Sequence, residues 1–349
     1  MSPSAIAIAQ AIVLILLLGS DGGADGYPTA RMESAGEQRQ SFRMTSIPFH
    51  ETLAPHEAVS DLPPQLALGS LVAVAPVRST SNVAAWSRAS DELLAFLPGS
   101  TQCCESYSQF LETIGKRMYT VCIPYDNVVS VGTMCEGKAR CYPDLRMEAF
   151  NGSFHGVWGN NIQARLAGAL TYLYHRDDGL WSRYLNYSTG LPIWSRIRMA
   201  GHSQGAGAAA MIGYNRELAR VVQFSGVCDR SNWTASLGPP ATPASRFFGL
   251  ASAWDTLLCP TFMRQISSWK AEGALPNNSW PLSLHVTANF TTTSLGDSHT
   301  VVSDIDIPGC DMAHFNQTCD MMAHDSTVMS WPDMMSPYAD GLWQALCGI

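Results

Sequence analysis

The sequence has little charge and few basic residues. Only 14% of its 349 residues are charged, and 21 Lys and Arg stand against 29 Asp and Glu, which gives a formal net charge of -8. Proteins that bind nucleic acid or anionic membranes concentrate Lys and Arg, and this chain contains no basic run. The composition therefore excludes nucleic-acid binding as the main function.

Long apolar runs are also scarce. The longest covers residues 5–19, which matches the hydrophobic region of a signal peptide and is short for a bilayer span. Small residues follow at Ser20, Gly22 and Ala24, so we expect residues 1–26 to be a signal peptide. Because no Lys or Arg precedes the run, an uncleaved anchor is the alternative. We expect no membrane span beyond this signal, since later runs fall short of ~18 apolar residues.

The chain shows no internal repeat and no second core-forming region. Residues 27–64 are polar and rich in turn formers without periodicity, which predicts a loose lead-in. We therefore expect one large domain over residues 65–349.

Cysteines and glycosylation sequons are abundant. The ten cysteines suit an oxidising compartment, and the close pairs Cys135/Cys141 and Cys310/Cys319 are disulfide candidates, with buried free thiols as the alternative. The motif N-x-[ST] occurs at six positions, about three times as often as chance predicts. These are Asn151, Asn186, Asn232, Asn277, Asn289 and Asn316. Together with the leader, they predict a secreted glycoprotein.

Strand-length apolar runs alternate with helical patterns after residue 70. Strands are expected at residues 71–77, 92–97, 118–123, 196–200, 220–225, 246–253 and 282–288, and helices at 106–116, 162–175, 205–214 and 262–272. Such alternation predicts an α/β fold, with a mostly parallel central sheet and helices on both faces.

A G-x-S-x-G motif, Gly201-His202-Ser203-Gln204-Gly205, lies between a predicted strand and a predicted helix. This is the setting of a nucleophile elbow, in which a strained turn exposes a serine hydroxyl and glycines allow strand and helix to approach. Ser203 is therefore the candidate nucleophile.

A serine nucleophile needs a base and a carboxylate that orients the base. Asp255 ends a predicted strand after the motif, and His299 follows the last predicted strand, so Ser203, Asp255 and His299 form the expected triad. Asp229, one strand earlier, is the alternative acid. His314 and His324 are the alternative bases.

The oxyanion formed in acyl transfer needs two N–H donors. We expect one from Gln204, the residue after the nucleophile, and the other from Ser100 in the loop Pro98-Gly99-Ser100-Thr101. An ordinary turn is the alternative for this loop.

These motifs resemble those of α/β-hydrolase-fold serine hydrolases from about residue 71 to residue 346. The runs FLPGS, MYTVCIPYDN, WSRIRMAGHSQGAG, ATPASRFFGLASAWD, DSHTVV and AHDSTV resemble, in the same order, a little-characterised group of bacterial-type hydrolases. The resemblance implies the α/β-hydrolase fold and a Ser, Asp, His triad, without a known substrate. The sequons and additional cysteines depart from the bacterial pattern.

The expected function is therefore a secreted serine hydrolase that cleaves carboxylic esters, esterase-like or lipase-like, on a small-molecule or lipid-like substrate. Such a mechanism requires no metal and no cofactor. The alternative is a hydrolase-fold protein without turnover that acts as an extracellular binding or surface protein.

Overall fold

The computed structural model divides the chain into two units, residues 1–40 and 41–349. The described residues all lie in the second unit. They are 43–48, 70–75, 91–153, 161–176, 180–256, 259, 262–284, 295–307, 309–310, 316–329, 336, 338–339 and 341–349. The expected signal peptide lies outside the described residues.

A nine-stranded sheet forms the centre of this unit, in the order β1-β2-β4-β3-β7-β8-β9-β11-β10. Its strands are β1 (Arg43–Pro48), β2 (Ser70–Ala75), β3 (Leu93–Leu97), β4 (Tyr119–Cys122), β7 (Ile197–His202), β8 (Arg220–Phe224), β9 (Phe247–Ser252), β10 (Leu282–Leu284) and β11 (Thr300–Ser303). A separate antiparallel pair consists of β5 (Leu185–Asn186) and β6 (Leu191–Pro192).

Most of the large sheet is parallel. Only the pairings of β1 with β2 and of β2 with β4 are antiparallel, whereas the strands from β4 to β10 run in the same direction. The carboxyl ends of these parallel strands therefore meet at one edge of the sheet, where open α/β sheets place their sites.

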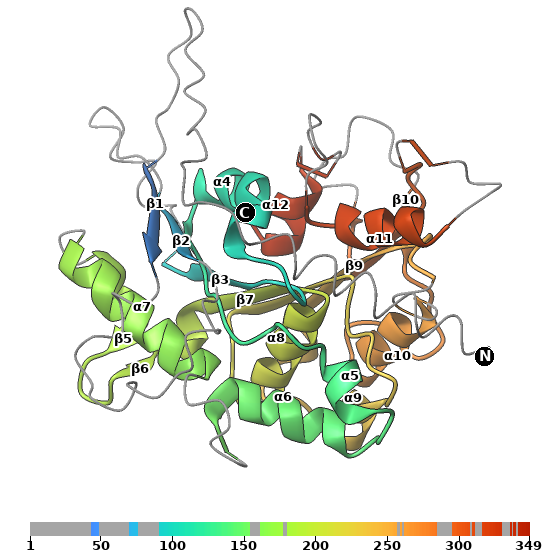
Figure 1. Ribbon diagram of the computed structural model, residues 1–349, viewed down its shortest axis with the longest axis horizontal. Helices are drawn as coiled ribbons and strands as arrows, with labels where there is room; N and C mark the ends of the chain where they lie inside the picture. Colours follow the sequence, from blue (N-terminus) through green and yellow to red (C-terminus); the bar gives the residue numbers. More distant parts are fainter. Residues whose placement is uncertain are drawn as a thin grey trace, which may run out of the picture. The chain divides into compact units, whose positions relative to one another are not determined.

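Helices cover both faces of the sheet (Figure 1). They are α4 (Ser108–Gly115), α5 (Val131–Cys135), α6 (Cys141–Asn151), α7 (Ile162–Arg176), α8 (Gln204–Asn215), α9 (Trp233–Ser236), α10 (Met263–Ala271), α11 (Gln317–Ser326) and α12 (Leu342–Cys347). In Figure 1, α4, α11 and α12 lie above the sheet, whereas α6, α7, α8 and α10 lie below it.

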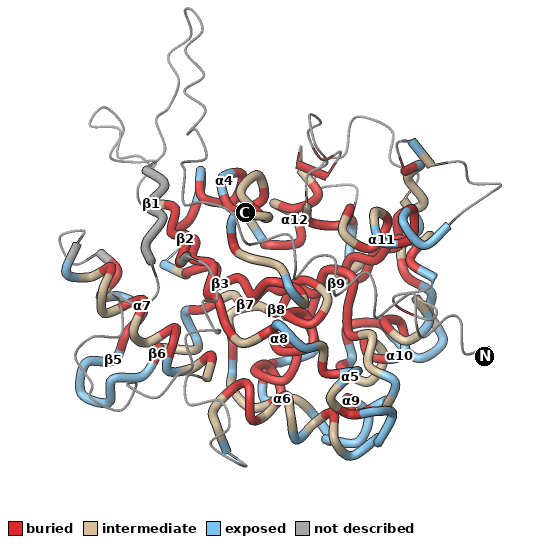
Figure 2. Tube along the Cα trace, in the orientation of Figure 1, coloured by how far each residue is buried: buried red, intermediate tan, exposed pale blue. Residues whose placement is uncertain are grey.

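Two apolar cores result, one on each face, and the buried strands run between them (Figure 2). Along β3, Leu93, Ala95 and Leu97 enter the core with α7 and α8, whereas Leu94 and Phe96 enter the core with α4 and α12. Because both faces are buried, the strand is apolar throughout, as expected for a parallel sheet. The α/β fold class predicted from the sequence is confirmed.

The sequence also located most of the strands of the sheet and the helices α4, α7, α8 and α10, but it did not predict α5, α6, α9, α11 or α12. Among the strands, β11 is the important exception. Its four residues TVVS were not predicted as a strand, yet they pair in parallel with β9 and β10. The strand β1 lies within the segment 27–64 that the sequence described as a lead-in. A short strand has too few residues to show a clear pattern.

Both predicted disulfides are confirmed, and the structure adds two more. Cys135 pairs with Cys141 and Cys310 with Cys319, while Cys104 pairs with Cys122 and Cys228 with Cys259. Four disulfides fit an oxidising, extracellular environment. Within the described residues, no helix is both long enough and apolar enough to cross a membrane.

A buried acid lies beneath the sheet at the end of α10. Glu272 is 1% exposed, accepts a hydrogen bond from Nε2 of Gln223 over 2.7 Å, and accepts another from the Ser268 hydroxyl over 3.2 Å. Burial raises the pKa of Glu272 to about 8, although these two hydrogen bonds oppose the shift. The folded protein therefore holds this proton more tightly than the unfolded chain.

This difference makes folding dependent on pH. Because the pKa of Glu272 is raised in the folded state, its stabilising contribution is fully present at pH values below the unfolded pKa of about 4.3. This contribution is lost as pH rises through about 8. We expect Glu272→Gln to lose less stability than wild type between pH 5 and pH 9, as measured by the free energy of unfolding in urea.

The matched control is Glu217→Gln, because Glu217 is an exposed acid paired with Arg246. This control should leave the pH dependence close to that of wild type. Equal pH slopes for Glu272→Gln and wild type would show that Glu272 does not hold its proton in the folded state.

Candidate active site

The turn between β7 and α8 carries Ser203. Its backbone has φ 53° and ψ -113°, a region that residues with side chains seldom adopt. A Cβ on Gly201 would overlap the backbone of Gly205, and one on Gly205 would overlap the carbonyl of Leu97. The two glycines therefore allow the strand-helix approach that holds Ser203 in this conformation.

Ser203 lines a cavity of about 600 Å³ at the carboxyl edge of the sheet. His324 and Gln204 line the same cavity, together with residues 99–102 of the loop after β3. Ser203, His324 and the expected oxyanion loop thus all face one cavity.

Asp255 follows β9 and is fully buried. Its Oδ2 accepts hydrogen bonds from Nδ1 of His324 over 2.7 Å and from Nε2 of Gln265 over 3.3 Å. Its Oδ1 accepts the backbone N–H of Cys259 over 3.2 Å. Three donors around one buried carboxylate fix its orientation.

His324 lies on α11, and neighbouring groups hold that helix against the strand ends. Asp320, one turn earlier on the same face, accepts the backbone N–H of Thr256 over 2.6 Å, immediately after Asp255. The Ser225 hydroxyl at the end of β8 donates to the carbonyl of His324 over 2.6 Å. These contacts position the His324 ring between Asp255 and the cavity.

The structure does not bring His299 to this site. His299 immediately precedes β11, at the amino end of that strand, where it stacks on Phe248 with ring centroids 4.4 Å apart. Phe248 lies near the start of β9, so this group is at the opposite edge of the sheet from Asp255.

The expectation that Asp255 orients His299 is therefore wrong, and His324 takes that position. The histidine bonded to Asp255 does follow the last strand of the chain, but that strand is β11, which the sequence did not reveal. The spacing Asp320-x-x-x-His324, with both residues on one helical face, was the available signal.

Asp229 is engaged elsewhere. Its carboxylate accepts two hydrogen bonds from the buried guanidinium of Arg146, one of them over 2.7 Å, and another from Nε1 of Trp233 over 2.6 Å. Gly207 makes room for Arg146, because a Cβ there would overlap the guanidinium. Asp229 thus serves as the counter-ion of Arg146, and Asp255 is the acid that faces a histidine.

Both predicted oxyanion donors border the cavity with Ser203. Gln204 is the first residue of α8, where a backbone N–H has no acceptor within the helix. In the loop after β3, the N–H of Gly99 donates to Tyr107 and that of Thr101 donates to Asn127. The N–H of Ser100 lies between them and has no acceptor within the described part of the chain.

The loop is held from several sides. The side-chain amide of Asn127 donates to the carbonyls of Gly99 and Gln102, and the Ser100 hydroxyl donates to Oε1 of Gln204 over 2.7 Å. The hydroxyl of Tyr125 donates to the carbonyl of Pro98 over 3.0 Å. The loop is thus more constrained than an ordinary strand-ending turn.

His202 links the loop to the helix that carries His324. Burial, and then the neighbouring His324, lower the pKa of His202 well below its usual value, so its ring is neutral. Its Nε2 donates to the carbonyl of His324 over 3.2 Å, and its Nδ1 accepts from the hydroxyl of Tyr107 over 2.9 Å. Tyr107 in turn accepts the Gly99 N–H over 2.9 Å.

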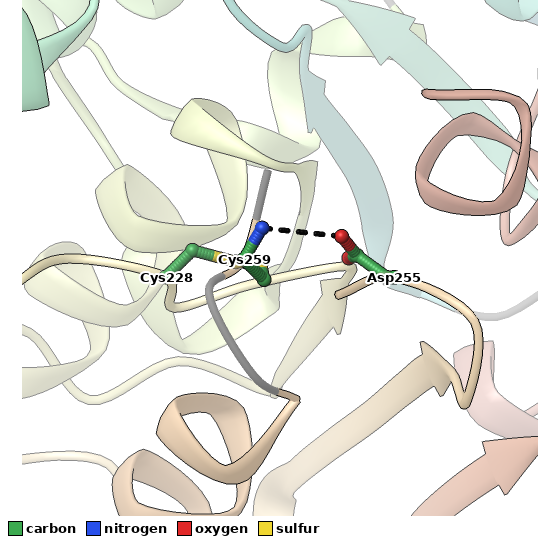
Figure 3. A group of neighbouring side chains, drawn as sticks. All are labelled: Cys228, Asp255 and Cys259. Carbon is green, nitrogen blue, oxygen red and sulfur yellow. Dashed lines mark hydrogen bonds between the residues drawn. A yellow bond between two sulfur atoms is a disulfide. The ribbon is translucent and has the colours of Figure 1, made fainter. Parts of the chain in front are cut away.

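Cys228, Asp255 and Cys259 bring ligand-type atoms within 4.8 Å of one another (Figure 3). The two sulfurs are joined in a disulfide, so neither is a thiolate that could ligate a metal. The disulfide instead ties the chain after β8 to the segment after β9, beside the carboxylate of Asp255.

The sequons lie mainly at exposed positions. Asn186, Asn232, Asn277 and Asn316 are exposed, Asn151 is half-buried, and Asn289 lies outside the described residues. Exposed asparagines leave room for glycans, and glycosylation itself stays a prediction.

The fold and site together define an α/β protein with a mostly parallel sheet and flanking helices, an architecture compatible with the α/β-hydrolase fold. No protein-family model matches the sequence, and no curated protein matches it.

The electrostatic environment of His324 yields a test of this geometry. Burial lowers the pKa of His324, but the charge and hydrogen bond of Asp255, together with the charges of Asp325 and Asp320, raise it by more, so the pKa lies above its usual value. In Asp255→Asn the burial effect remains, whereas the largest of these opposing charges and its charge-assisted hydrogen bond are lost. We expect the pKa of His324, measured by NMR titration, to fall below its wild-type value.

Asp297→Asn is the matched control, because Asp297 acts on His299 and raises its pKa. This variant should leave the titration of His324 unchanged. A His324 that titrates identically in wild type and Asp255→Asn would contradict the observed pair.

Proposed function

We propose that this protein is a serine hydrolase of the α/β-hydrolase fold that cleaves carboxylic esters through Ser203, His324 and Asp255. The observation that carries the proposal is a strained serine that lines the same cavity as a histidine, while Nδ1 of that histidine is hydrogen-bonded to a buried carboxylate. A purely structural role would require neither the strain at Ser203 nor this ordered pair.

The three residues have distinct roles in the proposed reaction. Nε2 of His324 takes the proton of Ser203 as Oγ attacks the ester carbonyl, while Asp255 fixes the ring through Nδ1. The protonated His324 then gives that proton to the departing alcohol. Water, deprotonated by His324, attacks the acyl group, releases the carboxylic acid and restores Ser203.

The amides of Ser100 and Gln204 would stabilise the negative charge on the carbonyl oxygen in both steps. Their contribution depends on preorganisation, because donors that are already in place need not reorganise as the charge develops. The contacts from Asn127, Tyr107 and Gln204 to the loop provide that support.

The disulfides, the exposed sequons and the N-terminal apolar run support a secreted glycoprotein as the setting for this activity. The alternative of an inactive extracellular binding protein is decided by the same kinetic experiment.

The test is hydrolysis of p-nitrophenyl butyrate by wild type, His324→Ala and His299→Ala. Loss of the base should lower kcat by about 10³-fold or more in His324→Ala. His299→Ala is the matched control, since it removes a histidine at the opposite sheet edge and should keep kcat within about threefold of wild type.

Two results would count against the proposal. Wild-type protein that is folded by circular dichroism and yet hydrolyses no ester would favour the inactive binding protein. A loss of kcat in His299→Ala with retention in His324→Ala would show that the base is wrongly assigned.

A further inference from the structure

A second, smaller cavity of about 180 Å³ adjoins the one that contains Ser203. The two cavities share Asp229, Arg230 and Arg264 in their walls. Ser231 lines the smaller cavity as well. This pocket therefore adjoins the cavity that Ser203 lines, and it presents two cationic side chains.

Two donors in this pocket lack protein acceptors. Nη1 of Arg264 and Oγ of Ser231 are both buried, and neither has a hydrogen-bond partner among the described residues. A buried guanidinium N–H without an acceptor is costly, and the hydroxyl adds a second buried polar group of the same kind. Both residues line the smaller cavity, which offers space for a ligand with acceptor oxygens.

The charge balance in the pocket favours an anion. Besides the two arginines, Asp229 is the charged residue in the wall, and its charge is neutralised by the ion pair with Arg146. Arg230 is exposed, and neither it nor Arg264 forms an ion pair within the described part of the chain. The pocket thus carries two arginines without carboxylate partners, and this positive charge suits an anionic ligand.

The elements around the pocket fix Arg264. It lies in the first turn of α10, and the hydroxyl of Ser268, one turn later on the same face, lies 3.1 Å from the hydroxyl of Thr234 in α9. The Cys228–Cys259 disulfide ties the chain just before Arg230 to the segment that precedes α10. Gln265, next to Arg264, donates to Asp255. The pocket is therefore built on the same helix that supports the acid.

We propose that this pocket, formed by Arg230, Ser231 and Arg264, binds a carboxylate of the substrate, so that the enzyme prefers esters that carry a second, free carboxylate. This inference rests on the proposed ester hydrolysis at Ser203. A guanidinium fork and a hydroxyl match the two oxygens of a carboxylate.

The experiment compares two esters of nearly equal size. One is mono-p-nitrophenyl glutarate, which bears a free carboxylate at the far end. The other is p-nitrophenyl methyl glutarate, in which that carboxylate is replaced by a neutral methyl ester. Wild type should show a kcat/KM for the anionic ester about tenfold or more above that for the neutral ester. Mono-p-nitrophenyl succinate and adipate, each with its methyl ester, extend the comparison to shorter and longer arms.

Arg264→Gln and Ser231→Ala test the pocket itself. The ratio of the two kcat/KM values should fall about tenfold or more in Arg264→Gln and by a smaller factor in Ser231→Ala. Arg183→Gln, which removes a surface arginine paired with Asp91, is the matched control and should retain the wild-type ratio. Labelling of each variant by a fluorophosphonate reports on its folding independently of the ester used.

The outcomes separate this inference from the proposed function. If wild type hydrolyses neutral and anionic esters with equal kcat/KM at all three arm lengths, the carboxylate pocket is disproved and the hydrolase remains. An unchanged ratio in a folded Arg264→Gln variant would also overturn the inference. If wild type hydrolyses none of the esters, the proposed function fails as well.

Discussion

The close approach of β7 to α8 is the constraint on which the site depends. Gly201 and Gly205 allow two backbones to meet where any side chain would collide, and Ser203 is held between them at a positive φ. The same approach places the first N–H groups of α8 beside the serine. The proposed nucleophile and one proposed oxyanion donor thus follow from a single packing contact, and the other proposed groups are arranged around it.

Much of this arrangement follows from local sequence. The motif around Ser203 combines a strand, a turn and a helix within one short segment, so both its conformation and its glycine requirement were predictable. Asp255 was predictable as well, because it ends a strand with a clear apolar pattern. The loop at Ser100 was located by its place after the third strand, although the sequence did not reveal the contacts from Asn127 and Tyr107 that hold it.

The proposed base was less predictable, for a physical reason. His299 immediately precedes β11, whereas His324 follows it on α11, and β11 has only four residues. Its identity as a strand depends on pairing with β9 and β10, which are distant in sequence and supply the hydrogen bonds that a short segment cannot form alone. Asp320 and Ser225 then orient α11 through tertiary contacts, which periodicity does not encode.

The scarcity of charged residues fits a sheet that is buried on both faces, and buried charged residues near the cavity form ion pairs. Arg146 pairs with Asp229, and Asp255 pairs with His324, so these four buried groups near the cavity have partners. The Cys228–Cys259 disulfide joins the segments that carry these acids. The substrate preference proposed for Arg264 depends on this scaffold and is separable from the chemistry at Ser203.

The most direct test of the central claim is to locate the covalent adduct after the folded protein reacts with a fluorophosphonate. Intact-mass measurement and peptide mapping should find one adduct per chain, on Ser203, and none in Ser203→Ala. An adduct on another residue, or no adduct on folded wild-type protein, would contradict the assignment of Ser203 as an activated nucleophile.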